Sequence, residues 1–355
     1  MAHSQRQAFI DWMKVIGMFL IVFGHVIGSH EHLFNQFTQP IYTKQLGVAF
    51  FIFIMGWGLA NETSSDWLQV VYKRLFPIYF YGVGIALVVS VISWFTANDL
   101  NESNYLPFAF GANVLLNYFP ANPSTWYIGT YFHVLLLWAV LLRHISFNKW
   151  WFLAAIVCEV VVRALLIAAN KDFIAYMLLP NWLGVFLLGY CLAKQGDCGF
   201  SRATGLVAAA WLLGLLLWAY ALNPLNLDND FPFRNLPDYQ GHLAILLKSM
   251  VISSIYLVNT WLAFQLARRL FVSKWVSLIA RNTLLIFIIH MPVIYAFTQD
   301  FYSLFGYGDA GRLLWILVIF FGIALFSEAI TRAININTIR DWLWNLLRHR
   351  KVPAS

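Results

Sequence analysis

The chain has 355 residues, of which 61% are hydrophobic and only 11% are charged. A soluble domain typically carries about 25% charged residues, so this composition excludes an ordinary soluble protein and indicates a multi-pass membrane protein. A net charge of +7 is compatible with nucleic-acid binding. The basic residues are distributed by membrane side, however, which argues against a nucleic-acid partner.

Ten apolar segments are expected to cross the lipid bilayer as helices, because each is close to the length that a membrane span requires. They are residues 9–29, 44–60, 76–96, 124–142, 150–169, 178–193, 203–222, 243–265, 276–298 and 312–334. The fold class is therefore all-α, a polytopic membrane helix bundle. We expect residues 1–338 to form one transmembrane domain. Residues 339–355 are expected to form a short basic amphipathic segment on the cytoplasmic face.

The basic residues predict the orientation of this bundle. When the loops are assigned to alternate sides, 17 of the 23 Lys and Arg residues fall on the N-terminal side and 6 on the other. The positive-inside rule then places both termini in the cytoplasm. The longer outer loops are rich in acidic and aromatic residues, which suit a polyhydroxylated ligand such as a sugar. Solvated loops with an interfacial aromatic belt would have the same composition.

The first apolar segment carries three ionisable residues, Asp11, Lys14 and His25. Lys14 and His25 are eleven residues apart, close to three helical turns, so they share one face with Asp11 near it. An ionisable group inside a membrane span is costly and indicates a functional site. An imidazole there can act as a general base or as a nucleophile that carries an acyl group. The alternative is a structural hydrogen bond between helices.

Two adjacent cations, Lys73 and Arg74, precede Pro77 at the start of the third segment. Proline is favoured in the first turn of a helix, so we expect the helix to begin there. Cations beside the free N–H groups of a helix start can bind phosphate. The alternative is an ordinary anchor at the cytoplasmic surface of the membrane.

Later segments carry further ionisable residues. Glu159 and Arg163 lie four residues apart, as do Glu328 and Arg332, so each pair is expected to neutralise itself. Glu328 could instead orient His25. The three cysteines show no metal-like spacing with histidine, so no metal site is predicted.

Several short motifs occur in a characteristic order. They are Asp11-x-x-Lys14, His25, the block Gly47–Gly58, the basic pair before Pro77, Ser124–Ile128 and Asn282–His290. In this order they resemble the acyltransferase-3 family of membrane acyltransferases, which includes bacterial O-acetyltransferases of surface glycans. The resemblance covers nearly the whole chain.

The resemblance implies a membrane O-acyltransferase of the bacterial inner membrane, with acetyl-CoA or another acyl-CoA as donor. The acceptor would be a hydroxyl of a cell-surface or lipid-linked sugar. His25 matches the essential histidine of the family, with Lys14 and Asp11 as further catalytic candidates, and Lys73 and Arg74 would bind the donor. The chain departs from the family in two places. Lys14 replaces the usual arginine, and Val71 replaces the first arginine of an Arg-x-x-Arg signature.

Four further residues are candidates for acceptor binding, namely Glu31, Trp126, His290 and Glu328. Glu31 follows the first segment on the outer side, and the Trp126 ring could stack on a sugar or belong to the interfacial belt. Two other function classes are compatible with the composition, a transporter or flippase of a lipid-linked saccharide and a non-catalytic scaffold. A deep histidine combined with cations at the inner mouth favours the acyltransferase.

Overall fold

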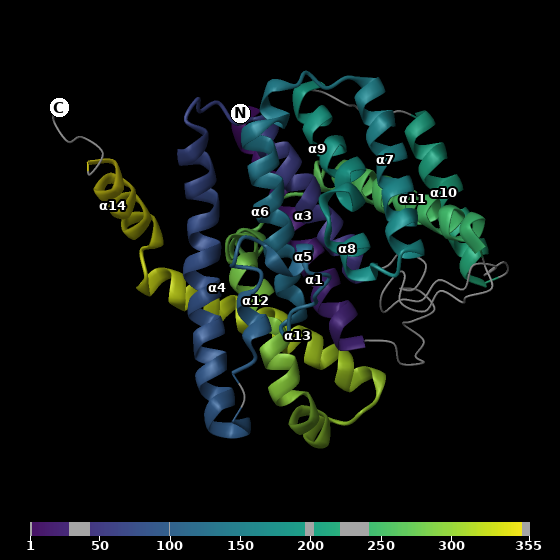
Figure 1. Cartoon of the computed structure of the whole chain (residues 1–355). Coiled ribbons are helices and arrows are strands. Elements are labelled where there is room, and N and C mark those ends of the chain that lie inside the picture. The colour runs from purple at the N-terminus through teal and green to yellow at the C-terminus, as the bar shows by residue number, and fades with distance from the viewer. Residues whose placement is uncertain (1, 28–42, 99, 196–201, 221–240, 350–355) are drawn as a thin grey trace.

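The computed structural model describes residues 2–27, 43–98, 100–195, 202–220 and 241–349. The described part of the chain is helical and contains no strand (Figure 1). The predicted segments coincide with ten helices, which are α1 (Ala2–Ile27), α3 (Thr43–Ala60), α4 (Trp67–Ala97), α6 (Trp126–Val140), α7 (Lys149–Ala168), α9 (Leu183–Gln195), α10 (Arg202–Tyr220), α11 (Gly241–Ala267), α12 (Lys274–Phe305) and α13 (Asp309–Ala333). The all-α fold class is thereby confirmed.

Within the described residues, eight helices are long and apolar enough to cross a membrane. The two predicted spans outside this set are α9 and α10. Helix α9 has only 13 residues and is preceded by the short helices α8 (Asp172–Met177) and η5 (Leu179–Trp182). The range 178–193, predicted as one span, is therefore divided between η5 and α9.

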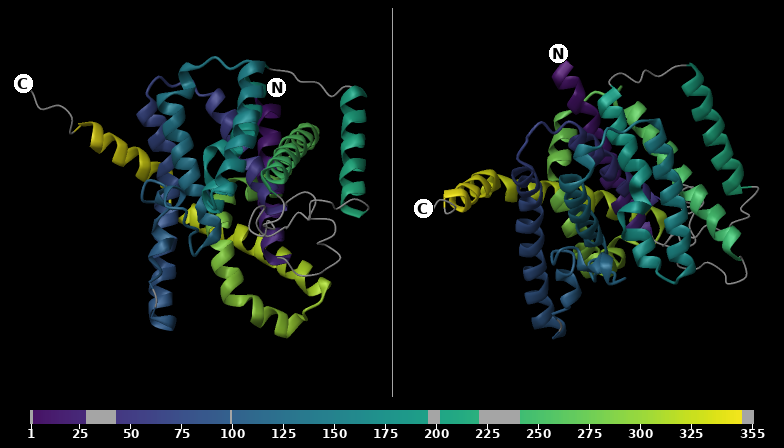
Figure 2. Two further views of the ribbon diagram at one scale, coloured as in Figure 1. Left: turned by 45° about the vertical axis from the view of Figure 1, so that its right-hand side comes forward. Right: turned by 45° about the horizontal axis from the view of Figure 1, so that its top comes forward.

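Helix α3 lies at the centre of the bundle and packs on α1 and α9 (Figure 2). Glycines allow the backbones to approach closely. A Cβ atom at Gly47 would collide with the backbone carbonyl of Gly17 on α1. A Cβ atom at Gly56 would likewise collide with the Phe186 carbonyl on α9. Small residues at helix interfaces are the usual means of close packing in membranes, where lipid offers no hydrophobic driving force between helices.

Helix α4 begins ten residues earlier than the predicted start at Pro77. The Asp66 side chain caps it by accepting a hydrogen bond from the backbone N–H of Gln69, and Pro77 lies inside the helix. The prediction of a helix start at Pro77 was wrong because an aspartate cap is itself a strong start signal. Lys73 and Arg74 consequently lie on the helix, where the free N–H groups of a helix start are absent.

Helix α12 also contains a proline, Pro292, which leaves the carbonyl of Ile288 without its helical donor. The Nδ2 of Asn122 supplies the missing bond at 2.9 Å. Asn122 belongs to the segment between α4 and α6 and is held there by the Asn104 side chain, which accepts from its backbone N–H at 2.9 Å. The kinked turn of α12 is therefore fixed by a residue of another segment.

Helix α14 (Ile336–His349) is the amphipathic C-terminal element, and it projects from the bundle beside α4 (Figure 1). The Tyr72 hydroxyl donates to the Arg340 carbonyl at 2.9 Å, and its ring packs on Trp344 with centroids 4.9 Å apart. The Arg348 guanidinium pairs with Asp66 at 2.5 Å. The C-terminal helix is thus attached to the first turns of α4.

A buried ion pair joins α7, η5, α9 and α11. The Arg163 Nη2 lies 2.6 Å from the Glu159 Oε1, and both side chains are completely inaccessible to solvent. Arg163 also donates to the Asn181 and Ser249 carbonyls, at 2.7 and 2.8 Å. Glu159 accepts from the Ser253 hydroxyl at 2.6 Å as well. The expected neutralisation of Glu159 by Arg163 is confirmed, and both charges have additional hydrogen bonds.

Candidate functional site

The histidine predicted to be catalytic is paired with a second histidine. The His25 Nδ1 on α1 lies 2.9 Å from the His290 Nε2 on α12. The two ring centroids are 5.1 Å apart and the ring planes are inclined by 20°. His290 is completely buried, and its Nδ1 lies 3.0 Å from the Ile286 carbonyl oxygen one turn earlier in α12. The structure therefore assembles an imidazole pair from residues 265 positions apart.

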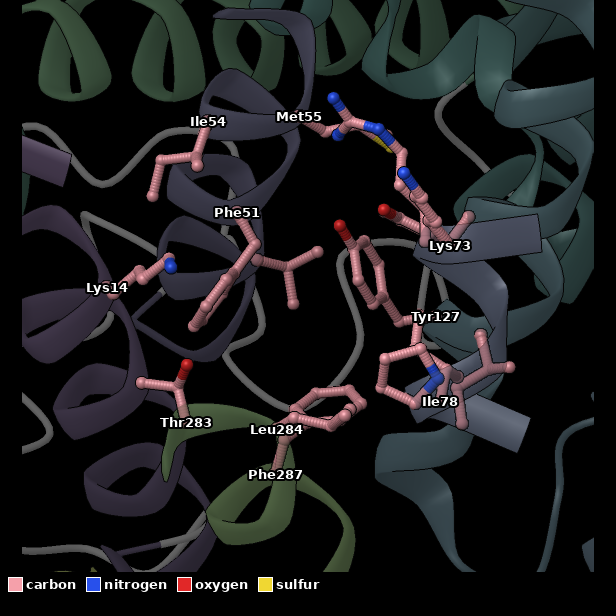
Figure 3. A pocket seen from close by; sticks show the side chains of 15 residues that line it. Lys14, Phe51, Ile54, Met55, Lys73, Ile78, Tyr127, Thr283, Leu284 and Phe287 are labelled. Atoms are coloured by element: carbon pink, nitrogen blue, oxygen red, sulfur yellow. The ribbon is translucent and has the colours of Figure 1, made fainter. Parts of the chain in front are cut away.

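A cavity of about 400 Å³ lies between α1, α3, α4, α6 and α12 (Figure 3). Its walls are mainly apolar and aromatic. Three cationic residues also line it, Lys14 from α1 and the pair Lys73 and Arg74 from α4. Figure 3 shows Lys14 and Lys73 approaching from different walls, with Tyr127 between them and Thr283 below Lys14. This cavity is large enough for a small-molecule substrate and carries cations on two of its walls.

The two cations on α4 differ in their surroundings. The Arg74 Nη2 donates to the Gly58 carbonyl at 3.1 Å and to the Glu62 carboxylate at 3.3 Å. Lys73 forms no ion pair or side-chain hydrogen bond with any residue that the structure describes. Arg74 is thus held by the end of α3, whereas Lys73 interacts with Asp341 through charge alone and can bind a ligand without breaking a hydrogen bond.

The aromatic side chain of Phe287 connects the cavity to the histidine pair. Phe287 lines the cavity, and its ring centroid lies 6.3 Å from that of His290. It also packs edge-on against Tyr127, another lining residue, with centroids 5.8 Å apart. From the sequence we did not name Phe287 or Tyr127 as site residues, although both lie within the motifs that carry the family resemblance. A ligand that filled the cavity would therefore end one side chain away from the imidazoles.

The remaining candidates are distributed differently. Asp11 lies outside the cavity lining, and its carboxylate accepts from the Ser277 hydroxyl at 3.4 Å. Trp126 is buried in an aromatic core, with ring centroids 4.6 Å from Tyr176 and 6.0 Å from Trp182. The Trp126 ring is therefore used in packing. Glu31 lies outside the described residues.

Glu328 does not contact His25 in the described part of the chain. Its carboxylate accepts from Arg281 at 2.7 and 2.8 Å and from Asn282 at 2.8 Å. The predicted pairing with Arg332 is confirmed at 2.9 Å. His290, one of the candidates for acceptor binding, makes the contact with His25 that we had considered for Glu328.

Comparison with known protein families identifies the family of the chain. The profile of a family described as an acyltransferase domain matches residues 7–332, which include His25, His290 and every residue that lines the cavity. The chain belongs to the acyltransferase-3 family. Neither curated proteins nor solved structures gave a match. The chain is accordingly a multi-pass membrane acyltransferase, and the cavity and the histidine pair both lie within its acyltransferase domain.

Proposed function

We propose that this acyltransferase moves an acyl group, expected to be acetyl, from cytosolic acyl-CoA to a hydroxyl of a cell-surface or lipid-linked sugar. The observation that carries the proposal is the cavity, which has cations in its walls and ends beside the imidazole pair. An acyl-CoA donor has the matching shape. Its phosphates suit Lys73, and its long, thin arm suits the aromatic interior.

The cavity also offers polar groups to such a donor. Pro77 removes the helical donor of the Lys73 carbonyl, and both residues line the cavity. The Thr283 hydroxyl and the Lys14 ammonium group are also directed into the space in Figure 3. These groups can bind the amides of the donor arm. His25 would then either take the proton of the acceptor hydroxyl or carry the acyl group briefly, and both routes remain open.

The orientation of the chain supports the same reaction. The positive-inside rule places the Lys73 end of α4 on the cytoplasmic side, where CoA is made. His25 lies sixteen residues beyond Phe9, about 24 Å along the helix axis, and so is closer to the outer side. We propose the bacterial inner membrane as its location, with the acceptor approaching from outside.

The proposed function is tested by two measurements on the full-length protein. Purified protein in detergent or nanodiscs should release CoA from acetyl-CoA, and release should accelerate when a suitable glycan acceptor is added. Mass spectrometry of surface glycans from cells with and without the protein should show one acyl mass lost in its absence. Absence of both CoA release and a glycan mass difference would contradict the proposal.

Changing Lys73 to glutamine should raise the KM for acyl-CoA with little change in kcat. One partly exposed ion pair with phosphate contributes about 1 kcal/mol, which corresponds to roughly a five-fold change in affinity. Steady-state kinetics with varied acetyl-CoA measure this effect. Lys274→Gln is the matched control, because Lys274 is an exposed cation at the start of α12 outside the cavity lining. Equal KM values for the two variants would remove Lys73 from the donor site.

A further inference from the structure

The contacts of the histidine pair determine which nitrogen atoms carry hydrogen. The Ile286 carbonyl oxygen can only accept, so the Nδ1 of His290 must be the protonated nitrogen of that ring. A neutral imidazole has one N–H, which leaves the His290 Nε2 as an acceptor. The Nδ1 of His25 must then donate to it across 2.9 Å. This leaves the Nε2 of His25 with an unshared electron pair.

The neutral form of both rings follows from their location. His290 is completely buried between membrane-spanning helices, where an ionised side chain is costly. The part of the chain that the structure describes places no carboxylate in contact with either imidazole, so a positive charge there would have no counter-ion among these residues. Two neutral rings avoid this cost. One hydrogen bond joins them, and the His290 ring donates a second one to the Ile286 carbonyl oxygen.

The His290 ring is also held in a fixed position. Its turn of α12 contains the Pro292 kink, and the Asn122 side chain holds the Ile288 carbonyl of that turn at 2.9 Å. The Phe287 ring packs beside it from the cavity. A rigid acceptor of this kind orients its partner ring as well as selecting the tautomer, as second partners of catalytic and metal-binding histidines do.

We propose that His290 is a positioning residue that fixes His25 as the Nδ1–H tautomer and makes the Nε2 of His25 the reacting atom. This inference rests on the proposed function. In the direct route, Nε2 takes the hydroxyl proton of the acceptor while the acceptor oxygen bonds to the thioester carbonyl carbon. The carbon–sulfur bond breaks, and the thiolate of CoA recovers the proton from Nε2. In the covalent route, the Nε2 electron pair attacks the same carbon, the carbon–sulfur bond breaks and CoA leaves as the thiolate. The acceptor oxygen then bonds to the acyl carbon, the bond from that carbon to Nε2 breaks, and the hydroxyl proton passes to the thiolate.

Two substitutions at position 290 separate tautomer control from packing. His290→Gln keeps a side-chain oxygen that can accept from the His25 Nδ1–H, whereas His290→Leu fills similar space without an acceptor. The leucine variant should lower kcat roughly 100-fold, the lower end of what a positioned proton-transfer group contributes. The glutamine variant should stay within about ten-fold of the native kcat. Both variants should keep the native KM for acetyl-CoA, because His290 is not a lining residue of the cavity.

A spectroscopic measurement tests the tautomer without any donor bound. Nitrogen NMR of protein labelled with ¹⁵N-histidine distinguishes protonated from unprotonated ring nitrogens, and His25→Gln identifies the signals of His25. We expect a protonated Nδ1 and an unprotonated Nε2 in the native protein and in His290→Gln, and a mixture of tautomers in His290→Leu. A protonated Nε2 in the native protein would overturn the inference, as would equal kcat values for the two variants. Both results would leave the proposed function standing if His25→Ala is inactive.

Discussion

Replacing His25 by alanine is expected to lower the rate of acyl transfer by about 1,000-fold, the mid-range contribution of a positioned acid–base group. The imidazole is the only ionisable group of α1 that contacts His290 in the described residues, and His290 in turn packs beside Phe287, which lines the cavity. CoA release and transfer to acceptor, measured on equal amounts of purified protein, give the two rates.

The control for this experiment is His133→Ala. His133 lies on α6, and its Nε2 hydrogen-bonds to the Phe110 carbonyl at 2.8 Å, outside the cavity lining. This variant should keep near-native rates, which shows that loss of a membrane histidine does not by itself abolish activity. Native rates in His25→Ala, with normal insertion into the membrane, would exclude both chemical roles of His25. Detection of an acyl group on His25 after rapid quenching would select the covalent route.

Changing Arg163 to methionine is expected to give the largest loss of stability, about 3–5 kcal/mol, because it leaves the Glu159 carboxylate buried without its partner. Both side chains are fully inaccessible, and the guanidinium donates to five backbone or side-chain acceptors beyond the carboxylate, on Asn181, Ser249 and Ser253. The free energy of unfolding can be followed by tryptophan fluorescence during denaturation in mixed micelles. The network is separate from the cavity, so kcat of the folded fraction should remain native.

Two companion variants make this prediction specific. The double variant Glu159→Gln with Arg163→Met removes both charges and should recover part of the lost stability. Arg348→Gln breaks an ion pair with Asp66 whose side chains are 63% and 29% exposed, and it should cost less than about 1 kcal/mol. A loss in Arg163→Met no larger than in Arg348→Gln would contradict the importance of the buried pair.

Local sequence patterns predicted much of the fold. Apolar segments of membrane-spanning length located the eight helices that, within the described residues, are long and apolar enough to cross a membrane, and the four-residue spacing of Glu159 and Arg163 predicted their ion pair. Both features depend on neighbours along one helix, which the sequence displays directly. The glycines of residues 47–58 form close helix contacts whose partners on α1 and α9 could not be identified without the structure.

The features that define the site were harder to predict because they depend on distant residues. His25 and His290 were each singled out, but their pairing requires the parallel packing of α1 and α12, in which Asp11 also meets Ser277. Glu328 was considered as the partner of His25, whereas Arg281 on the neighbouring helix occupies its carboxylate. The start of α4 was misplaced because proline is compatible with both the first turn of a helix and, in membranes, its interior.

Pro292 has a consequence for the order in which this protein is assembled. A regular helix closes each of its hydrogen bonds with residues four positions apart, as soon as the segment is made. At Ile288 that local bond is replaced by one from Asn122, 166 residues earlier in the chain. Synthesis completes the segment that carries Asn122 long before α12 emerges. The turn that holds His290 thus reaches its final form only on docking against a part of the protein already in place, and maturation of the histidine pair coincides with closure of the bundle.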